Sequence, residues 1–203
     1  MEAIITEQIT PAGFEIVRDR IGEILFLELT KQKELFPANV PEKLNIFSEA
    51  IVPQEITEQV FINVLLDSEG YPSENPKSAN AKTTFFVDIY TTGSETPETS
   101  GDTVSSNRLH RYIRFCRYIL RSGKYSTLGF ANNIIGGKSV EGFEVLMPAQ
   151  KEDSAFTRFA RLTFSVRLTE NEQLWQGIAL AGNDTGVKLQ QTDDGYKYVF
   201  ENN

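Results

Sequence analysis

Hydrophobic residues recur at helical spacing in two segments of the chain. In residues 11–36 the apolar positions repeat every three or four residues, and in residues 105–121 they fall within about 120° of a helical wheel. Pro37 stops the first pattern, and Ser122-Gly123 is a typical helix end after the second. We therefore predict two amphipathic helices, one over each segment.

Runs of β-branched, aromatic and aliphatic residues predict strands in much of the remaining chain. The longest run, residues 156–168, alternates apolar positions such as Phe164 with polar positions such as Arg161, which indicates one buried and one wet face. Asp193-Asp194-Gly195 is a typical hairpin turn between the last two runs. The expected elements are irregular strands or turns over 41–59 and strands over 60–66, 83–91, 125–130, 140–146, 156–168, 187–191 and 196–200.

Two polar stretches rich in Gly, Pro, Ser, Thr and Asn, residues 67–82 and 93–102, separate these runs and predict long exposed loops. Together the elements predict a single α+β domain over residues 1–203. We expect an antiparallel or mixed β-sheet with two main helices packed on one face, plus a C-terminal β-hairpin. Residues 183–203, which contain this hairpin, are expected to form a C-terminal arm.

Composition narrows the class of protein. The 203 residues are 40% hydrophobic and 24% charged, which is typical of a soluble globular domain. The net charge of −8 argues against a general nucleic-acid binder, whose affinity comes mostly from lysine and arginine. No run approaches the 18 or more apolar residues of a membrane span. The start of the chain lacks a basic and then apolar leader, so we expect synthesis in a cytoplasm.

Few residues have the chemistry of a catalytic or metal site. His110 and Cys116 are the only histidine and cysteine, and no carboxylates stand at a spacing that would complete a zinc site. Six helical residues separate the two by roughly 9 Å of rise, so they cannot form a nucleophile pair. Residues 135–139 lack the glycine that a phosphate-binding loop needs at position 132, and we interpret them as a turn. We expect no metal and no cofactor.

Asp88 is the one carboxylate worth testing for a catalytic role. It lies inside an apolar strand, where a shifted pKa would mark a functional group, although a wet strand face explains it more simply. Asp67 and Asp102 show no evident partner either. A small hydrolase or transferase that uses Asp88 is therefore kept as an alternative function.

The strongest local charge feature is a stripe of arginines on the second predicted helix, opposite its apolar side. Its members are Arg108, Arg111, Arg114, Arg117 and Arg121. The stripe is consistent with a solvated helix face, with a subunit interface or with a nucleic-acid contact. No aromatic residues or flanking basic runs accompany it, which makes the nucleic-acid contact the weakest of the three interpretations.

The order of elements resembles that of tailed-phage neck proteins, above all tail terminators. The resemblance covers roughly residues 11–170 and rests on the order of elements, since the family has no catalytic signature. After the long first helix, the segments that carry it are Val-Phe-Ile-Asn-Val-Leu-Leu at 60–66, Phe-Phe-Val-Asp-Ile-Tyr-Thr at 85–91, Arg-Leu-His-Arg-Tyr-Ile-Arg at 108–114, Tyr-Ser-Thr-Leu-Gly-Phe at 125–130 and Arg-Leu-Thr-Phe-Ser-Val at 161–166.

The resemblance implies a structural virion protein without enzyme activity. Such subunits usually assemble as a six-fold ring that caps the tail tube and joins it to the head-side connector, or stopper, protein. DNA would pass through the lumen without specific binding, because an excess of acidic side chains along the lumen would repel phosphates. Another neck or tail component, such as a head-completion adaptor or a tail-tube subunit, remains the nearest alternative.

A ring of identical subunits needs two different complementary patches on one molecule. Our hypothesis is that the arginine stripe forms one patch and that an acidic segment forms the other. The acidic segment is either residues 95–102, with Glu95, Glu98 and Asp102, or residues 67–74.

Overall fold

The structure is a computed structural model that describes residues 11–50, 59–71, 79–131, 134–146, 156–170, 182–188 and 195–201. The chain divides into two compact units, Met1–Glu172 and Gln173–Asn203. In the second unit, β6 (Gly182–Lys188) pairs antiparallel with β7 (Gly195–Glu201). The expected turn at 193–194 lies outside the described residues, and the arm over 183–203 stays a prediction.

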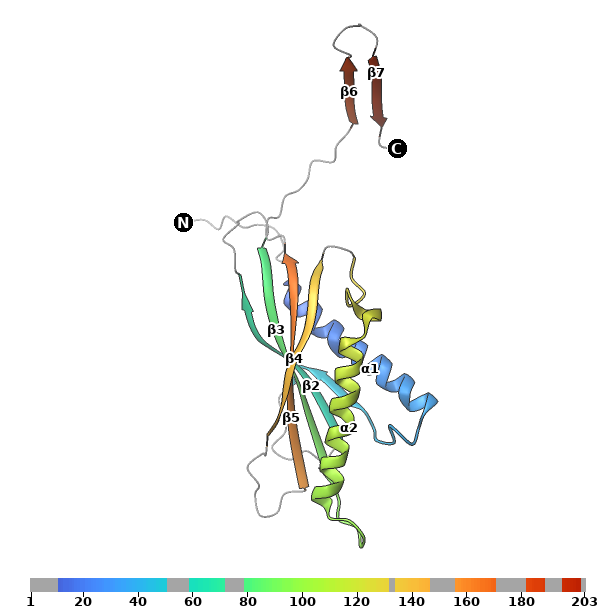
Figure 1. Cartoon of the computed structure of the whole chain (residues 1–203), viewed down its shortest axis with the longest axis vertical. Coiled ribbons are helices and arrows are strands. Elements are labelled where there is room, and N and C mark those ends of the chain that lie inside the picture. Colours follow the sequence, from blue (N-terminus) through green and yellow to red (C-terminus); the bar gives the residue numbers. More distant parts are fainter. Residues whose placement is uncertain are drawn as a thin grey trace, which may run out of the picture. The chain divides into compact units, whose positions relative to one another are not determined.

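The first unit contains a five-stranded mixed sheet with the order β1-β2-β3-β5-β4 (Figure 1). Only the edge strand β1 pairs in parallel, with β2, and all the other neighbours are antiparallel. The strands are β1 (Asn45–Ser48), β2 (Val60–Gly70), β3 (Ala79–Gly93), β4 (Ile135–Leu146) and β5 (Phe156–Glu170).

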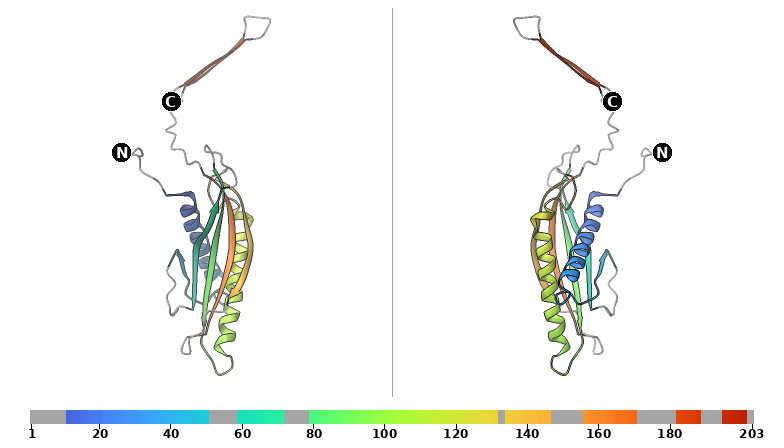
Figure 2. Two further views of the ribbon diagram at one scale, coloured as in Figure 1. Left: turned by 90° about the vertical axis from the view of Figure 1, so that its left-hand side faces the viewer. Right: turned by 90° about the vertical axis from the view of Figure 1, so that its right-hand side faces the viewer.

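Two long helices, α1 (Gly13–Leu35) and α2 (Gly101–Arg121), lie on one face of this sheet. The right-hand view of Figure 2 shows both helices in front of the strands, and the left-hand view shows the opposite face. Helix α1 packs against β1 and β2, and α2 packs against β3 and β5. The prediction of an α+β unit with two helices on one face of a mixed sheet is confirmed.

The core lies between the helices and the sheet. Its residues follow the two periodicities that the sequence shows, every second residue on β3 and β5 and every third or fourth on the helices. Burial of each large side chain contributes about 1.5–3 kcal/mol, so this layer is the main source of stability. The largest fully buried side chains include Ile21, Leu25, Phe85, Ile89, Leu109, Tyr112, Leu120 and Phe164.

The opposite face of the sheet carries a row of aromatic rings. Phe61, Tyr90 and Phe159 stand opposite one another on β2, β3 and β5. The Tyr90 and Phe159 ring centroids are 4.4 Å apart, those of Phe61 and Tyr90 are 5.9 Å apart, and Phe47 stacks on Phe61. Such pairs are worth about 0.5–1.5 kcal/mol beyond their buried area, which favours this register of the strands.

The structure differs from the predicted polar loop over 67–82. Strand β2 continues to Gly70, and β3 already begins at Ala79. The polar residues at these ends pair across the two strands, as where the Thr83 hydroxyl donates to the Glu69 carboxylate at 2.8 Å. Backbone hydrogen bonds between strands do not require apolar side chains. The strands predicted from the hydrophobic pattern were therefore too short.

The predicted strand over 125–130 is wrong. A 3-10 helix, η1 (Gly123–Tyr125), and turns occupy this region. Leu128 and Gly129 have φ angles of 52° and 82°, which a strand does not tolerate. The turn is held by Arg20, whose Nε donates to the Leu128 carbonyl at 2.9 Å. The turn expected at 135–139 is also wrong, because these residues begin β4.

Candidate functional site

The arginine face of α2 comprises Arg108, Arg111, Arg114, Arg117 and Arg121. Helix α2 begins four residues earlier than predicted, where the Ser100 hydroxyl accepts a hydrogen bond from the Thr103 amide at 3.3 Å. Its apolar side is buried as the periodicity predicts, with Leu109, Tyr112 and Cys116 in the core. Only Arg114, Arg117 and Arg121 of the arginine face are exposed, whereas Arg108 and Arg111 are largely buried.

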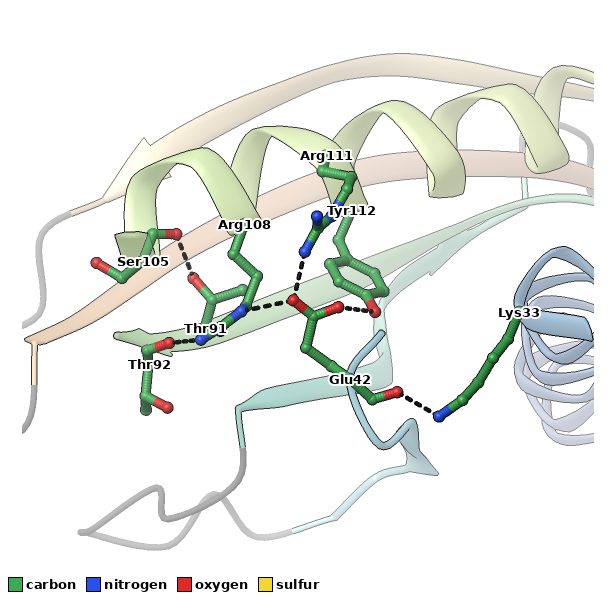
Figure 3. Close-up of polar contacts among 8 residues, drawn as sticks. All are labelled: Lys33, Glu42, Thr91, Thr92, Ser105, Arg108, Arg111 and Tyr112. Carbon is green, nitrogen blue, oxygen red and sulfur yellow. Dashed lines mark hydrogen bonds and ion pairs between the residues drawn. The ribbon is translucent and has the colours of Figure 1, made fainter. Parts of the chain in front are cut away.

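The first two arginines turn toward a buried carboxylate (Figure 3). Glu42, in the segment between α1 and β1, is only 3% exposed and has both its oxygens bound by donors from α2. Arg108 Nε donates to Glu42 Oε1 at 2.8 Å, and Arg111 donates to the same oxygen. The Tyr112 hydroxyl donates to Oε2 at 3.0 Å. Glu42 is thus neutralised and hydrogen-bonded inside the subunit, as a buried charge requires.

Further hydrogen bonds surround this cluster, and among its described atoms Arg111 Nε is buried without a hydrogen-bond partner. Lys33 Nζ donates to the Glu42 carbonyl at 2.8 Å, and the Thr91 hydroxyl donates to the Ser105 carbonyl at 2.9 Å (Figure 3). Arg108 also donates to the carbonyl of Thr92. Burial, helped by the adjacent carboxylate, raises the pKa of the Tyr112 phenol well above its ordinary value. The cluster joins α1, α2 and β3 around one side chain, so its role is structural.

The last three arginines are exposed and line a groove of about 460 Å³ between α2 and β4. Among the described residues, no carboxylate oxygen lies within 4 Å of their guanidinium nitrogens. Arg114 lies over the ring of Phe115, 5.4 Å from its centroid. The groove is lined by His110, Ile113, Arg114, Arg117, Tyr118, Arg121 and Phe143. It combines concentrated positive charge with aromatic surface.

Tyr118 forms a ridge along one side of this groove. It is 79% exposed, the highest value among the large hydrophobic side chains described. A second groove, of about 450 Å³, lies on its other side between α1 and α2 and also contains Arg114. There the Tyr125 hydroxyl donates to Glu28 at 2.5 Å, and this hydrogen bond raises the pKa of Tyr125. An exposed tyrosine among arginines is typical of residues that dominate protein–protein binding energy.

The C-terminal end of α2 is tied to β4 by Lys138. Its Nζ donates to the carbonyls of Leu120 at 2.6 Å and Ser122 at 2.9 Å, which are among the groups that a helix end leaves unpaired. Burial lowers the pKa of this ammonium. Because Phe143 lies on the same strand as Lys138, this contact also positions the far wall of the groove.

Two acidic segments were predicted as the partner patch. In residues 67–74, Asp67 is exposed, and residues 72–74 lie outside the described part of the chain. In residues 95–102, the acidic residues do not share one environment. Glu95 and Glu98 are exposed, and no described residue forms an ion pair with them. Asp102 instead receives two hydrogen bonds from Arg158, at 2.9 Å and 2.6 Å, so its charge is matched within the subunit. In residues 95–102, only the carboxylates of Glu95 and Glu98 are therefore available to another molecule.

Asp88 is not on a wet strand face, which corrects that interpretation. It is 1% exposed and bound by Arg161 through two hydrogen bonds of 2.8 Å each. The guanidinium of Arg161 lies 4.2 Å from the centroid of the Phe86 ring, and Asp88 raises the pKa of Arg161. Asp88 lines neither groove. A carboxylate held in this way supports the sheet and is poorly placed to act on a substrate.

The remaining candidates for chemistry are separated. Cys116 is completely buried, and burial raises the pKa of its thiol to about 12, whereas His110 lies exposed at the groove. Within the described residues, no three His, Cys, Asp or Glu side chains are grouped as a metal site requires. None of the described helices has the length and apolar character needed to cross a membrane.

No protein-family model matches the sequence, and no curated protein matches it either. The surfaces of this chain are therefore the features that indicate its function. Sequence reasoning identified the arginines but missed Tyr118, Phe143, Lys138 and Glu42. Of these four residues, only Tyr118 could have been identified from the sequence. A large aromatic residue on the arginine side of the helical pattern is unusual for a solvated face.

Proposed function

We propose that this protein is a ring-forming structural subunit of a tailed-phage neck, and specifically a tail terminator that caps the tail tube. One observation carries the proposal: two surfaces of opposite charge stand at opposite ends of α2. Glu95 and Glu98 precede the N-terminal end of the helix, and Arg114, Arg117 and Arg121 occupy its C-terminal half.

The distance between these surfaces prevents them from neutralising each other within one subunit. Helix α2 has 21 residues, which corresponds to a length of roughly 30 Å. Figure 1 shows the helix running along the sheet, with the segment that joins it to β3 at the lower end. At physiological salt the Debye length is about 8 Å, so each patch is best neutralised by a neighbouring molecule.

Unlike patches allow head-to-tail association. A two-fold dimer can also join acid to base, because the acidic patch of each copy then meets the basic patch of the other, but this uses both patches of both copies in one pair. A head-to-tail contact joins acid to base at every interface and leaves a patch of each kind free for the next subunit. Repetition of that contact with a closing rotation produces a ring. The net charge of −8 would then keep DNA in a lumen from binding to the wall.

The same surfaces are compatible with another neck or tail component. If the rotation between subunits does not close, the head-to-tail contact produces a tube instead of a ring, as a tail-tube subunit would require. The partners proposed for the ring are further copies of this chain, the tail-tube protein and the head-side connector or stopper protein.

The proposal is tested by the mass and shape of the purified protein. We expect closed rings in negative-stain electron microscopy and a multiple of the 22.9 kDa subunit mass in light scattering. Open tubes would identify a tube subunit. A solitary monomer at micromolar concentration, in low and physiological salt alike, would overturn the proposal.

A charge-reversal pair then tests which surface holds the ring. Arg114→Glu with Arg117→Glu should shift the ring to smaller species. The matched control reverses two exposed lysines elsewhere, with Lys31→Glu and Lys43→Glu, and should leave the ring intact. Both variants change the net charge by the same amount, so a difference between them reports the surface rather than the total charge.

A further inference from the structure

We propose that the groove between α2 and β4 is a receptor for an acidic turn, and that its occupant is the segment Gly93–Gly101 of a second copy of this chain. The inference rests on the proposed function, because it assigns the contact by which the ring subunits join. It goes beyond that function by naming the binding groove, the segment that enters it and the side chains that recognise it.

The groove has the chemistry of an acidic-peptide site. Arg114, Arg117 and Arg121 bring three guanidinium groups to one side, and in the described part of the chain no carboxylate neutralises them. Arginine binds carboxylates through paired N–H groups, which makes it well suited to such a site. Tyr118 and Phe143 supply exposed aromatic surface beside the charges. The volume of about 460 Å³ lies within the usual range of ligand clefts.

The turn is built to keep its shape without a partner. The backbone amide and carbonyl groups of Thr96 and Thr99 hydrogen-bond to each other in both directions, at 2.9 Å and 3.2 Å. The Thr99 amide also donates to the Thr96 hydroxyl at 3.1 Å. Pro97 occupies the tip, where its fixed φ angle suits a tight turn. A segment that is already ordered loses little conformational entropy when it docks.

The base of the turn is closed as tightly as its tip. A Cβ atom on Gly93 would lie 2.0 Å from the Gly101 carbonyl oxygen, so only glycine allows the two ends of the segment to approach this closely. Glu95 lies between these two closures and Glu98 lies at the tip beside Pro97, and both are exposed. The turn therefore presents two carboxylates on a rigid support.

Only another copy of the chain can bring this turn to this groove. Sixteen residues of α2 and its approach separate Glu98 from Arg114, which on a helix corresponds to about 24 Å. Two carboxylates against three guanidinium groups leave the interface close to neutral. The proline ring at the tip offers an apolar surface to Tyr118 and Phe143, because aromatic side chains pack well against rigid apolar groups.

A nucleic acid is the less favoured occupant. Its affinity would depend on many phosphate contacts, whereas the groove offers three arginines on a chain with a net charge of −8. Single-stranded DNA is therefore an outcome of the test.

Disulfide trapping tests the contact in the assembled protein. In the double variant Glu98→Cys, Arg117→Cys, we expect oxidation to convert rings into a ladder of covalent oligomers on a non-reducing gel. Each single variant should give no ladder, and neither should Glu98→Cys combined with Lys43→Cys, which lies elsewhere on the surface. Rings that form but yield no ladder would overturn the groove assignment and leave the proposed function standing. If the unmodified protein is itself a monomer, that result would instead count against the proposed function.

A peptide titration tests recognition without depending on the ring. The variant Glu95→Gln, Glu98→Gln should not assemble, and its empty groove should bind a peptide with the sequence of residues 93–101. Binding should weaken at least tenfold when both peptide glutamates are glutamine, and equally when Arg114→Gln and Arg117→Gln are added to the protein. Equal binding of both peptides, persistence of the ring in the variant, or tighter binding of single-stranded DNA of the same charge would each overturn the inference.

Discussion

The Tyr112 hydroxyl lies 3.0 Å from Oε2 of Glu42 and donates to it, although the two residues are 70 positions apart in the sequence. This contact divides the arginine face of α2 into two parts. The arginines nearest to it, Arg108 and Arg111, neutralise the same carboxylate and hold the subunit together. The arginines further along the helix are exposed, and no carboxylate of the described residues pairs with them. The single stripe in the sequence therefore occupies two different environments.

Glu42→Ala should lower the free energy of unfolding by about 3–5 kcal/mol, because it leaves two guanidinium groups and a phenol without their partner in a buried place. Urea unfolding followed by circular dichroism measures this change. The control is Glu34→Ala, which removes an exposed carboxylate paired with Lys31 and should cost less than about 1 kcal/mol. Equal losses of unfolding free energy in the two variants would show that the cluster around Glu42 contributes no more to stability than an exposed ion pair.

Arg111→Glu and Arg114→Glu should behave differently, although the residues are neighbours on the helix face. The first substitution places a second carboxylate beside Glu42 and should lower the melting temperature by several degrees or prevent folding. The second alters only the exposed groove and should leave the melting temperature nearly unchanged while weakening the proposed ring. Differential scanning calorimetry and light scattering separate the two effects. A ring that tolerates Arg114→Glu would contradict this division.

Asp88 and Arg161 should prove strongly coupled. Asp88→Ala should cost about 3 kcal/mol of stability, because it removes both acceptors of the paired hydrogen bonds and leaves the guanidinium over Phe86. Adding Arg161→Ala should cost less than its effect alone, with an interaction energy of about 1–3 kcal/mol in a double-mutant cycle. Strictly additive costs would mean that the pair makes no net contribution.

Lys138→Met should destabilise the end of α2 by about 1–2 kcal/mol, since two carbonyls lose their donor and the helix end loses a nearby positive charge. Methionine keeps most of the packing volume. Lys124→Met, at an exposed position just beyond the helix, serves as the control. Hydrogen exchange should show faster opening of the last turn of α2 only in the first variant.

Cys116 should make the protein sensitive to alkali. Burial raises the pKa of its thiol from an ordinary value near 8.5 to about 12, so above pH 9 the unfolded chain loses a proton that the folded chain retains. Stability should therefore fall as the pH rises from about 9 to 12, by roughly 1 kcal/mol per pH unit. In Cys116→Ala this contribution disappears, and the difference between the two stability curves isolates it. Parallel curves would show that the thiol titrates normally.

The periodic elements were predictable because burial determines the pattern of apolar residues directly. The spacing of Leu109, Tyr112 and Cys116 suffices to show which side of α2 faces the sheet. The pattern failed where backbone geometry rather than burial decides the structure. Leu128 stands between aromatic and β-branched residues that are typical of strands, yet its φ angle of 52° places it in a turn.

The candidate site was only half predictable for a different reason. The sequence shows five arginines on one side of a helix but not which of them find a carboxylate. Glu42 lies 66 positions from Arg108, in a segment without regular periodicity, and nothing local marks it as their partner. Phe143 and Lys138 likewise reach the helix through the pairing of β4 with β5. Such contacts depend on the tertiary arrangement.

The hydrogen bonds from Lys138 to the end of α2 have a consequence for kinetics. They fasten β4 to the helix, so that the walls carrying Phe143 and Arg121 cannot easily separate. A cleft with fixed walls selects its ligand by fit and does not wait for a slow opening step. In the proposed ring, addition of each new subunit should therefore proceed at the speed of electrostatically guided collision, and mismatched segments should be rejected at first encounter.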